Sequence, residues 1–254
     1  MRPLPRLLLV EDDASIRQFV AMALDDLAVT VVPCATVAQA LAALAEGPVA
    51  LVLTDLNLGG EASGWTLLER LAADPALAGW ARRVVFSATE AAALADRPGW
   101  SALQVAQVLS KPVSVGALRQ CVQTALAAVG GDPAPADRET SGAAPAPQGR
   151  AAAVASHFEG DVLLYEAFRA GSLAQFAQDL AVGEAACAAV DGATLRHLGH
   201  SLRTVLGLLG EPAAGALAGR LQQVAEAGAS REDLAAAWQA LRQALQRVIQ
   251  TPAP

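Results

Sequence analysis

The chain has 254 residues, of which 54% are hydrophobic and 17% charged, so it has enough apolar side chains to bury a sizeable core. Aromatic residues make up 4% and much of the apolar content is alanine, which favours closely packed helices over an all-β core. The net charge is −7 and lysines and arginines form no cluster, which argues against nucleic acid as a partner.

The cysteines and the N-terminus indicate a soluble cytoplasmic protein. Cys34, Cys121 and Cys187 lie far apart and without CxxC spacing, as expected of free thiols in a reducing compartment. The apolar run Leu7–Val10 is too short for a signal peptide. A membrane span needs about 18 uncharged apolar residues, and we find no such stretch, so we expect no membrane insertion.

The first half of the chain alternates short apolar runs with helical patterns. We expect strands at Arg6–Val10, Val29–Val32, Val49–Thr54, Val84–Ser87 and Val105–Leu109. We expect helices at Ser15–Leu27, Val37–Leu44, Trp65–Leu71 and Val115–Val129. This alternation predicts a doubly wound, flavodoxin-like α/β domain with a five-stranded parallel sheet.

Residues 130–152 form a Pro/Ala/Gly-rich segment without hydrophobic periodicity, which predicts a flexible linker between domains at 1–129 and 153–254. Beyond the linker we expect helices at Leu163–Phe168, Leu173–Val190, Thr194–Leu209, Ala213–Ala227 and Arg231–Ile249. Gly171 is one of the predicted breaks between them. These helices predict an all-α antiparallel four-helix bundle.

Residues with possible chemical roles stand at the carboxyl ends of four of the predicted strands. They are Glu11–Asp12–Asp13, Asp55, Ser87 and Lys111–Pro112. The carboxyl ends of parallel strands meet at one rim, where clustered carboxylates would repel one another unless a cation such as Mg²⁺ lay among them. Lys111 would pair with the remaining negative charge and Ser87 would bond a phosphoryl oxygen, whereas Asp13 is expected to cap the following helix.

The motifs VEDD, LTDLNL, FSAT and SKP stand at these strand ends in this order, and residues 4–129 resemble the receiver domain of two-component response regulators. The resemblance implies that Asp55 is the phosphoacceptor. It implies that Glu11, Asp12, Asp55 and the Asn57 carbonyl hold Mg²⁺, that Ser87 and Lys111 bind the phosphoryl group, and that the Lys111–Pro112 bond is cis.

By the same resemblance, the phosphoryl donor would be a sensor histidine kinase. No enzymatic activity is implied beyond Mg-dependent self-phosphorylation and autodephosphorylation. One departure is Val108, where many receivers carry an aromatic switch residue.

The second domain contains a histidine at the centre of a helical pattern. Leucines of Thr194–Leu209 form one stripe, and His200 lies on the opposite face, where we expect an exposed, nucleophilic imidazole. The stretch beginning GHSLRTVLGLLG resembles the histidine-phosphotransfer (HPt) module. By that resemblance His200 is phosphorylated, with other receiver or HPt domains as partners. Arg203 and Thr204 stand where the family usually has lysine and glycine.

Three functions are compatible with this sequence. The leading one is a phosphorelay protein that accepts phosphoryl groups on Asp55 and His200. The second is a phosphorylation-gated adaptor, in which the helical bundle docks a partner or dimerises without being phosphorylated. The third is a metal-dependent phosphatase that uses the same acidic rim, with Asn57 and Thr89 near the reacting water.

Overall fold

The structure is a computed structural model that describes residues 3–60, 62–78, 81–88, 91–127 and 148–251. The chain divides into two compact units, residues 1–144 and 145–254, and each is described by itself. Most of the predicted linker, namely residues 130–147 of 130–152, lies outside the described residues.

The first unit is built on a parallel sheet of five strands. They are β1 (Arg6–Val10), β2 (Thr30–Cys34), β3 (Leu51–Thr54), β4 (Arg82–Ser87) and β5 (Val105–Ser110). The strand order is β2-β1-β3-β4-β5 and every neighbouring pair is parallel. The predicted doubly wound fold is confirmed, with an order reversal beside β1, which is the place where open α/β sheets bind their ligands.

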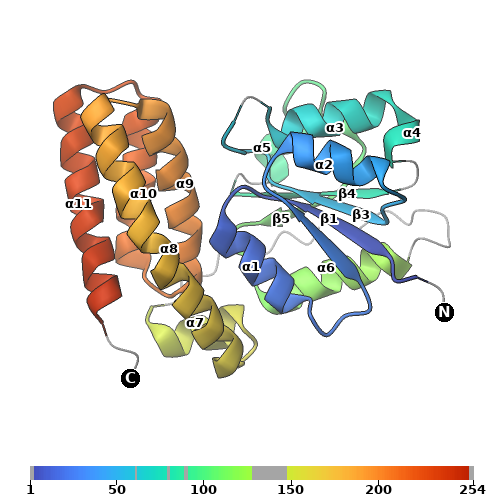
Figure 1. Cartoon of the computed structure of the whole chain (residues 1–254), viewed down its shortest axis with the longest axis horizontal. Coiled ribbons are helices and arrows are strands. Elements are labelled where there is room, and N and C mark those ends of the chain that lie inside the picture. Colours follow the sequence, from blue (N-terminus) through green and yellow to red (C-terminus); the bar gives the residue numbers. More distant parts are fainter. Residues whose placement is uncertain (1–2, 61, 79–80, 89–90, 128–147, 252–254) are drawn as a thin grey trace. The chain divides into compact units, whose positions relative to one another are not determined.

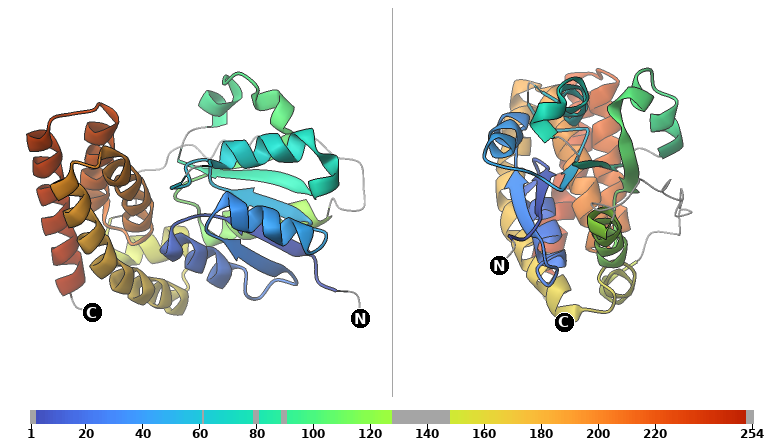
Figure 2. Two further views of the ribbon diagram at one scale, coloured as in Figure 1. Left: turned by 45° about the horizontal axis from the view of Figure 1, so that its top comes forward. Right: turned by 90° about the vertical axis from the view of Figure 1, so that its right-hand side faces the viewer.

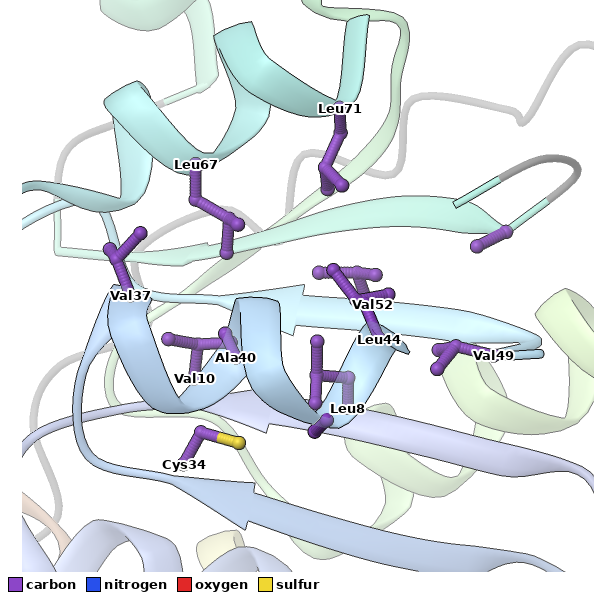
Figure 3. Packing of buried hydrophobic residues seen from close by; sticks show 12 residues of the cluster. Leu8, Val10, Cys34, Val37, Ala40, Leu44, Val49, Val52, Leu67 and Leu71 are labelled. Atoms are coloured by element: carbon purple, nitrogen blue, oxygen red, sulfur yellow. The ribbon is translucent and has the colours of Figure 1, made fainter. Parts of the chain in front are cut away.

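Helices cover both faces of this sheet (Figure 1). They are α1 (Ala14–Ala23), α2 (Val37–Ala45), α3 (Gly64–Ala73), the short α4 (Pro75–Ala78) and α5 (Ala91–Ala95), and α6 (Val115–Ala127). Helices α1 and α6 lie on one face, and α2 and α3 on the other (Figure 1). Side chains of α2 and α3 pack against Leu8, Val10 and Val52 of the sheet in a fully apolar cluster (Figure 3). The core therefore forms a rigid base under the strand ends.

Side-chain caps begin the helices that follow the rim. Asp13 Oδ1 accepts a hydrogen bond from the Ile16 N–H at 3.0 Å, which confirms its predicted capping role. Thr36 and Ser63 cap α2 and α3 in the same way. These caps fix where each loop between strand and helix ends, and so fix the geometry of the functional loops.

The segment between β4 and β5 is irregular, as Pro98–Gly99 in its sequence indicates. Instead of one long helix it contains α5 and a 3-10 turn at Trp100–Leu103. Arg83, which is 5% exposed, donates to the Leu71 and Leu103 carbonyl oxygens at 2.8 Å each. It thereby joins the end of α3 to the 3-10 turn, because buried carbonyls at helix ends need donors.

The second unit contains only helices among its described residues (Figures 1 and 2). They are α7 (Arg150–His157), α8 (Val162–Ala189), α9 (Gly192–Leu208), α10 (Pro212–Glu226) and α11 (Arg231–Gln250). The long helices contact one another in a ring, α8 with α9, α9 with α10, α10 with α11, and α11 with α8. The predicted all-helical bundle is confirmed.

Two details of this unit differ from the sequence-based expectations. Gly171 does not break a helix, because it lies inside α8, a continuous helix of 28 residues. A helical glycine costs about 1 kcal/mol relative to alanine, and the burial of Phe168 and Phe176 on either side outweighs that cost. Helix α7 was not expected, and it begins at Arg150, inside the segment predicted as linker.

None of the helices in the described ranges is both long and apolar enough to cross a membrane.

Candidate functional site

A buried ion cluster joins β1, β3 and β5 at the predicted rim. Lys111 Nζ donates to Glu11 Oε2 and to Asp55 Oδ2, each at 2.5 Å, although the residues lie 100 and 56 positions apart in the sequence. The three side chains are at most 2% exposed. Lys111 Nζ also lies 4.6 Å from the centre of the Phe86 ring. Two carboxylates therefore share one ammonium group in a site that excludes water.

The charges of this cluster perturb one another strongly. Burial raises the pKa of Glu11 well above its usual value; the Lys111 ammonium opposes this rise and the Asp55 carboxylate adds to it. Burial by itself would lower the pKa of Lys111, but the two carboxylates outweigh it and hold that pKa above its usual value. The cluster has more negative than positive groups, so a further cation would relieve the repulsion.

Asp55 is held in place by the backbone around it. Its Oδ1 accepts a hydrogen bond from the Asn57 N–H at 2.9 Å, and its main-chain carbonyl accepts one from Thr54 Oγ1 at 2.9 Å. A Cβ atom at Gly64 would lie 1.8 Å from the Asp55 carbonyl oxygen. The first residue of α3 must therefore be glycine for the loop to close against the phosphoacceptor candidate.

The remaining predicted residues of this site lie on the neighbouring strand ends and loops. Asp12 Oδ2 accepts a hydrogen bond from the Gly59 N–H at 2.6 Å, which ties the loop after β1 to the loop after β3. Ser87 ends β4 and is fully buried. Its main-chain carbonyl oxygen accepts a hydrogen bond from the main-chain N–H of Lys111 at 2.8 Å. The Lys111–Pro112 peptide bond is cis, as expected.

The donor set fits a hard divalent cation chemically. Glu11, Asp12 and Asp55 supply carboxylate oxygens and Asn57 supplies a carbonyl, which are the ligand types that Mg²⁺ prefers. Among the residues that the structure describes, no three Asp, Glu, His or Cys side chains are already gathered as a metal-binding group. Lys111 contacts both the Glu11 and the Asp55 carboxylate, so a cation bound there would share their oxygens with the ammonium group.

His200 lies near the middle of α9, on a helix as the sequence pattern predicted. The helical pattern predicted an exposed imidazole, whereas His200 is 5% exposed in the complete chain. Thr204 and Leu208, one and two turns further on the same face, are 4% and 0% exposed. The periodicity of one helix identifies its leucine stripe but not what lies against the opposite face, so the exposure of this imidazole in the helical unit by itself stays a prediction.

Three residues of the rim escaped the sequence analysis. Gly64 and Thr54 support the Asp55 backbone, and Arg17 bonds the Glu11 carbonyl through its Nη1 at 2.6 Å. A glycine directly after the Ser63 cap is a signal that could have been noticed. Nothing in the sequence around Arg17 indicates that its long side chain would turn back to the rim.

Comparison with known proteins assigns the first unit. Residues 7–123 match the response regulator receiver domain. Among solved structures, chemotaxis protein CheY4 of Vibrio cholerae is 21% identical, with 48% of this chain and 99% of that chain covered and a TM-score of 0.44. The signal receiver domain of an HD domain-containing protein from Pseudomonas fluorescens Pf-5 is 26% identical, with 49% and 95% covered and a TM-score of 0.44. No curated protein matches the chain.

Residues 7–123 therefore form a response regulator receiver domain, a phosphoacceptor module of two-component signal transduction. Such domains typically bind Mg²⁺ and in general have a cognate histidine kinase as partner. The helical unit lies outside this match and is not assigned to a family.

Proposed function

We propose that the chain is a phosphorelay protein in which Asp55 of the receiver domain and His200 of the helical unit both accept a phosphoryl group. The observation that supports it most directly is the contact of Lys111 Nζ with both Asp55 and Glu11 at 2.5 Å in a buried site. A buried carboxylate next to a fixed ammonium group is suited to receive a dianionic phosphoryl group. Sensor histidine kinases would be the donors.

In the proposed reaction an Asp55 carboxylate oxygen attacks the phosphorus atom of a donor phosphohistidine in line. The new P–O bond forms as the P–N bond breaks, and the donor imidazole leaves as a neutral group after taking up a proton. Lys111 would neutralise charge on the phosphoryl oxygens and Ser87 would donate a hydrogen bond to one of them. Glu11, Asp12, Asp55 and the Asn57 carbonyl would hold Mg²⁺, which supplies electrostatic stabilisation of the equatorial oxygens.

The proposed role of His200 rests on its place in the helical unit. It lies near the middle of α9, and Arg203, one turn later, would attract phosphoryl oxygens. Transfer between the two sites would break the acyl phosphate bond of Asp55 while an imidazole nitrogen of His200 forms a P–N bond and loses its proton. The same exchange can run in the opposite direction. Because both sites belong to one chain, each would be present at a raised effective concentration at the other.

A second function, the phosphorylation-gated adaptor, is favoured by Thr204, which stands one turn after His200 where the histidine-phosphotransfer family usually has glycine. Its β-branched side chain shares a face of α9 with His200 and would hinder the close approach of a phosphorylated partner. In this alternative, phosphorylation of Asp55 changes the receiver surface, and the bundle binds a partner without taking part in the chemistry.

Phosphotransfer assays distinguish the two functions. Wild type, Asp55→Asn and His200→Gln are treated with acetyl phosphate and Mg²⁺, then with a phosphorylated partner receiver, and the label is assigned from intact mass and its stability in acid and base. His197→Gln, one turn earlier on α9, is the matched control. The relay predicts label on Asp55 that also reaches, or arrives from, His200. Label on Asp55 with none on His200 under any donor supports the adaptor, and no label on either residue contradicts both.

A further inference from the structure

The turn between β1 and α1 carries the two acids that the proposed cation site needs. Arg17, on the first turns of α1, bends back so that its Nη1 donates to the main-chain carbonyl of Glu11 at 2.6 Å. The contact is short for an N–H···O bond, and the guanidinium is partly buried. Because this arginine donates to a main-chain carbonyl, its contact holds the backbone in place rather than a side chain.

This contact fixes the direction in which Asp12 leaves the strand. The Glu11 carbonyl belongs to the planar peptide that includes the nitrogen and Cα of Asp12, so holding the oxygen orients that whole unit. The Glu11 N–H donates to the Cys34 carbonyl at 3.0 Å, and the Asp13 N–H donates to Glu11 Oε1 at 3.3 Å. Arg17 holds the Glu11 carbonyl oxygen. The backbone is therefore held at the Glu11 N–H, at the Glu11 carbonyl and at the Asp13 N–H, on both sides of the peptide bond that joins Glu11 to Asp12.

We propose that Arg17 is a positioning residue for the cation site, holding the Glu11–Asp12 peptide so that both carboxylates face a divalent ion. This inference rests on the proposed Mg²⁺-dependent function of the Asp55 site. It concerns a residue that touches neither the phosphoryl group nor the cation, and it assigns the effect to geometry rather than to charge.

Geometry and charge predict opposite results when the guanidinium is removed. A positive side chain close to a cation site repels the ion, so an effect of charge alone would make Arg17→Gln bind the ion more tightly. If Arg17 positions the peptide, Arg17→Gln releases the Glu11 carbonyl and the ion binds more weakly. A hydrogen bond from a charged donor corresponds to about a tenfold or larger change in an equilibrium constant, so the two signs are separable even if only part of that effect reaches the ion.

The test measures cation binding directly in the full chain, with Mn²⁺ as a paramagnetic substitute for Mg²⁺. Loss of the free Mn²⁺ resonance on titration gives the dissociation constant without any phosphorylation step. The variants are Arg17→Gln and Arg17→Lys. Arg119→Gln is the matched control, because Arg119 Nε donates to the carbonyl of Ala23 at the other end of α1, at 2.7 Å. The Arg119→Gln change removes the same charge and also a hydrogen bond from an arginine to a carbonyl of α1, but at the end of α1 that lies far from Glu11 and Asp12.

We expect the dissociation constant to rise about fivefold or more in Arg17→Gln, to rise less in Arg17→Lys, and to stay within about twofold in Arg119→Gln. Binding that is unchanged or tighter in Arg17→Gln would overturn the inference and leave the proposed function standing. Wild type that binds no Mn²⁺ would overturn both. If circular dichroism shows that Arg17→Gln is unfolded, Arg17→Lys decides alone, and a wild-type constant in that variant overturns the inference.

Discussion

The two units of the chain bury polar side chains in different ways. In the receiver domain, Glu11, Thr54, Asp55 and Ser87 gather at the carboxyl ends of three neighbouring strands, where Lys111 joins them. In the helical unit, His157, Ser172, His200 and Thr204 are spread over three helices. A convergent cluster specifies one chemistry, because each member offsets the burial cost of another. Dispersed buried polar groups are compatible with packing as well as with function.

The same difference accounts for the receiver half being identified while the helical half is not. The rim combines residues from four separate segments, and chance alone rarely places all of them at strand ends in this order. A bundle of amphipathic helices follows general packing rules that serve many proteins. A single histidine on one helix adds little specificity to that pattern. Matched substitutions in the two units can therefore test this contrast.

The largest effect is expected from Lys111→Met in the buried cluster. Removing the ammonium group leaves two buried carboxylates facing each other, which should lower the unfolding free energy of the receiver domain by about 4 kcal/mol at pH 8. Glu11, whose pKa is already raised, would then hold a proton over a wider pH range in the folded state. A group with a raised folded pKa stabilises the fold at low pH and loses that effect as the pH rises, so the loss should be smaller at pH 5.

Chemical denaturation of the full chain at both pH values measures the effect of Lys111→Met. Glu46→Gln is the control, because Glu46 pairs with Arg6 on the surface with its side chain 72% exposed, and such pairs contribute about 1 kcal/mol or less. Equal losses of unfolding free energy in Lys111→Met and Glu46→Gln would show that the buried ion cluster contributes no more to stability than a surface ion pair.

Two glycines, one in each unit, test whether the stability of one unit is independent of the other. A Cβ at Gly64 would lie 1.8 Å from the Asp55 carbonyl oxygen, and a Cβ at Gly183 would lie 2.1 Å from the Trp238 ring. Each Gly→Ala change should destabilise its own unit by about 3 kcal/mol through overpacking. Acetyl phosphate labelling of Asp55 should fall in Gly64→Ala and stay at the wild-type rate in Gly183→Ala.

Thermal unfolding followed by circular dichroism should show two separable transitions in these variants. Gly192→Ala serves as the reference, since the nearest atom to its Cβ is 3.8 Å away. A Gly183→Ala chain that labels slowly at Asp55 would mean that the helical unit supports the receiver fold.

A smaller, pH-dependent effect is expected in the helical unit. Burial lowers the pKa of His157, which is 8% exposed at the end of α7, so the folded state keeps this imidazole neutral. The unfolded chain binds the proton more readily, and the unfolding free energy should therefore fall as the pH drops through 6.5. Melting curves between pH 7.5 and 5 should show a shallower decline for His157→Gln than for His197→Gln.

The smallest effect is a gain. Gly219 lies within α10, and an added Cβ would make an ordinary contact with Arg203 Cδ at 3.4 Å. Alanine is favoured over glycine in a helix by about 1 kcal/mol, so Gly219→Ala should raise the melting temperature of the helical unit alone. A lower melting temperature would mean that the Arg203 side chain needs the open space above Gly219.

Much of the receiver fold could be predicted because its signals are local. Continuous apolar runs such as VALVLT mark strands covered on both faces, and Asp13 lies where a helix cap is expected. The rim residues follow from topology, since parallel strands bring their carboxyl ends together whatever the sequence distance between them. The position of Gly171 is a counterexample, because tertiary packing overrode a local breaking signal.

The amino-acid sequence was enough to predict the doubly wound sheet, the division into a sheet unit and a helical unit, and the residues that meet at the acidic rim. Hydrophobic periodicity and strand-end motifs carry that information, and both are properties of short segments. The three-dimensional structure was needed to learn that Lys111 bridges Glu11 and Asp55 and that Gly64 packs against the Asp55 backbone. These facts depend on which surfaces meet in three dimensions, and the pattern of a single helix or strand does not record what packs against its far side.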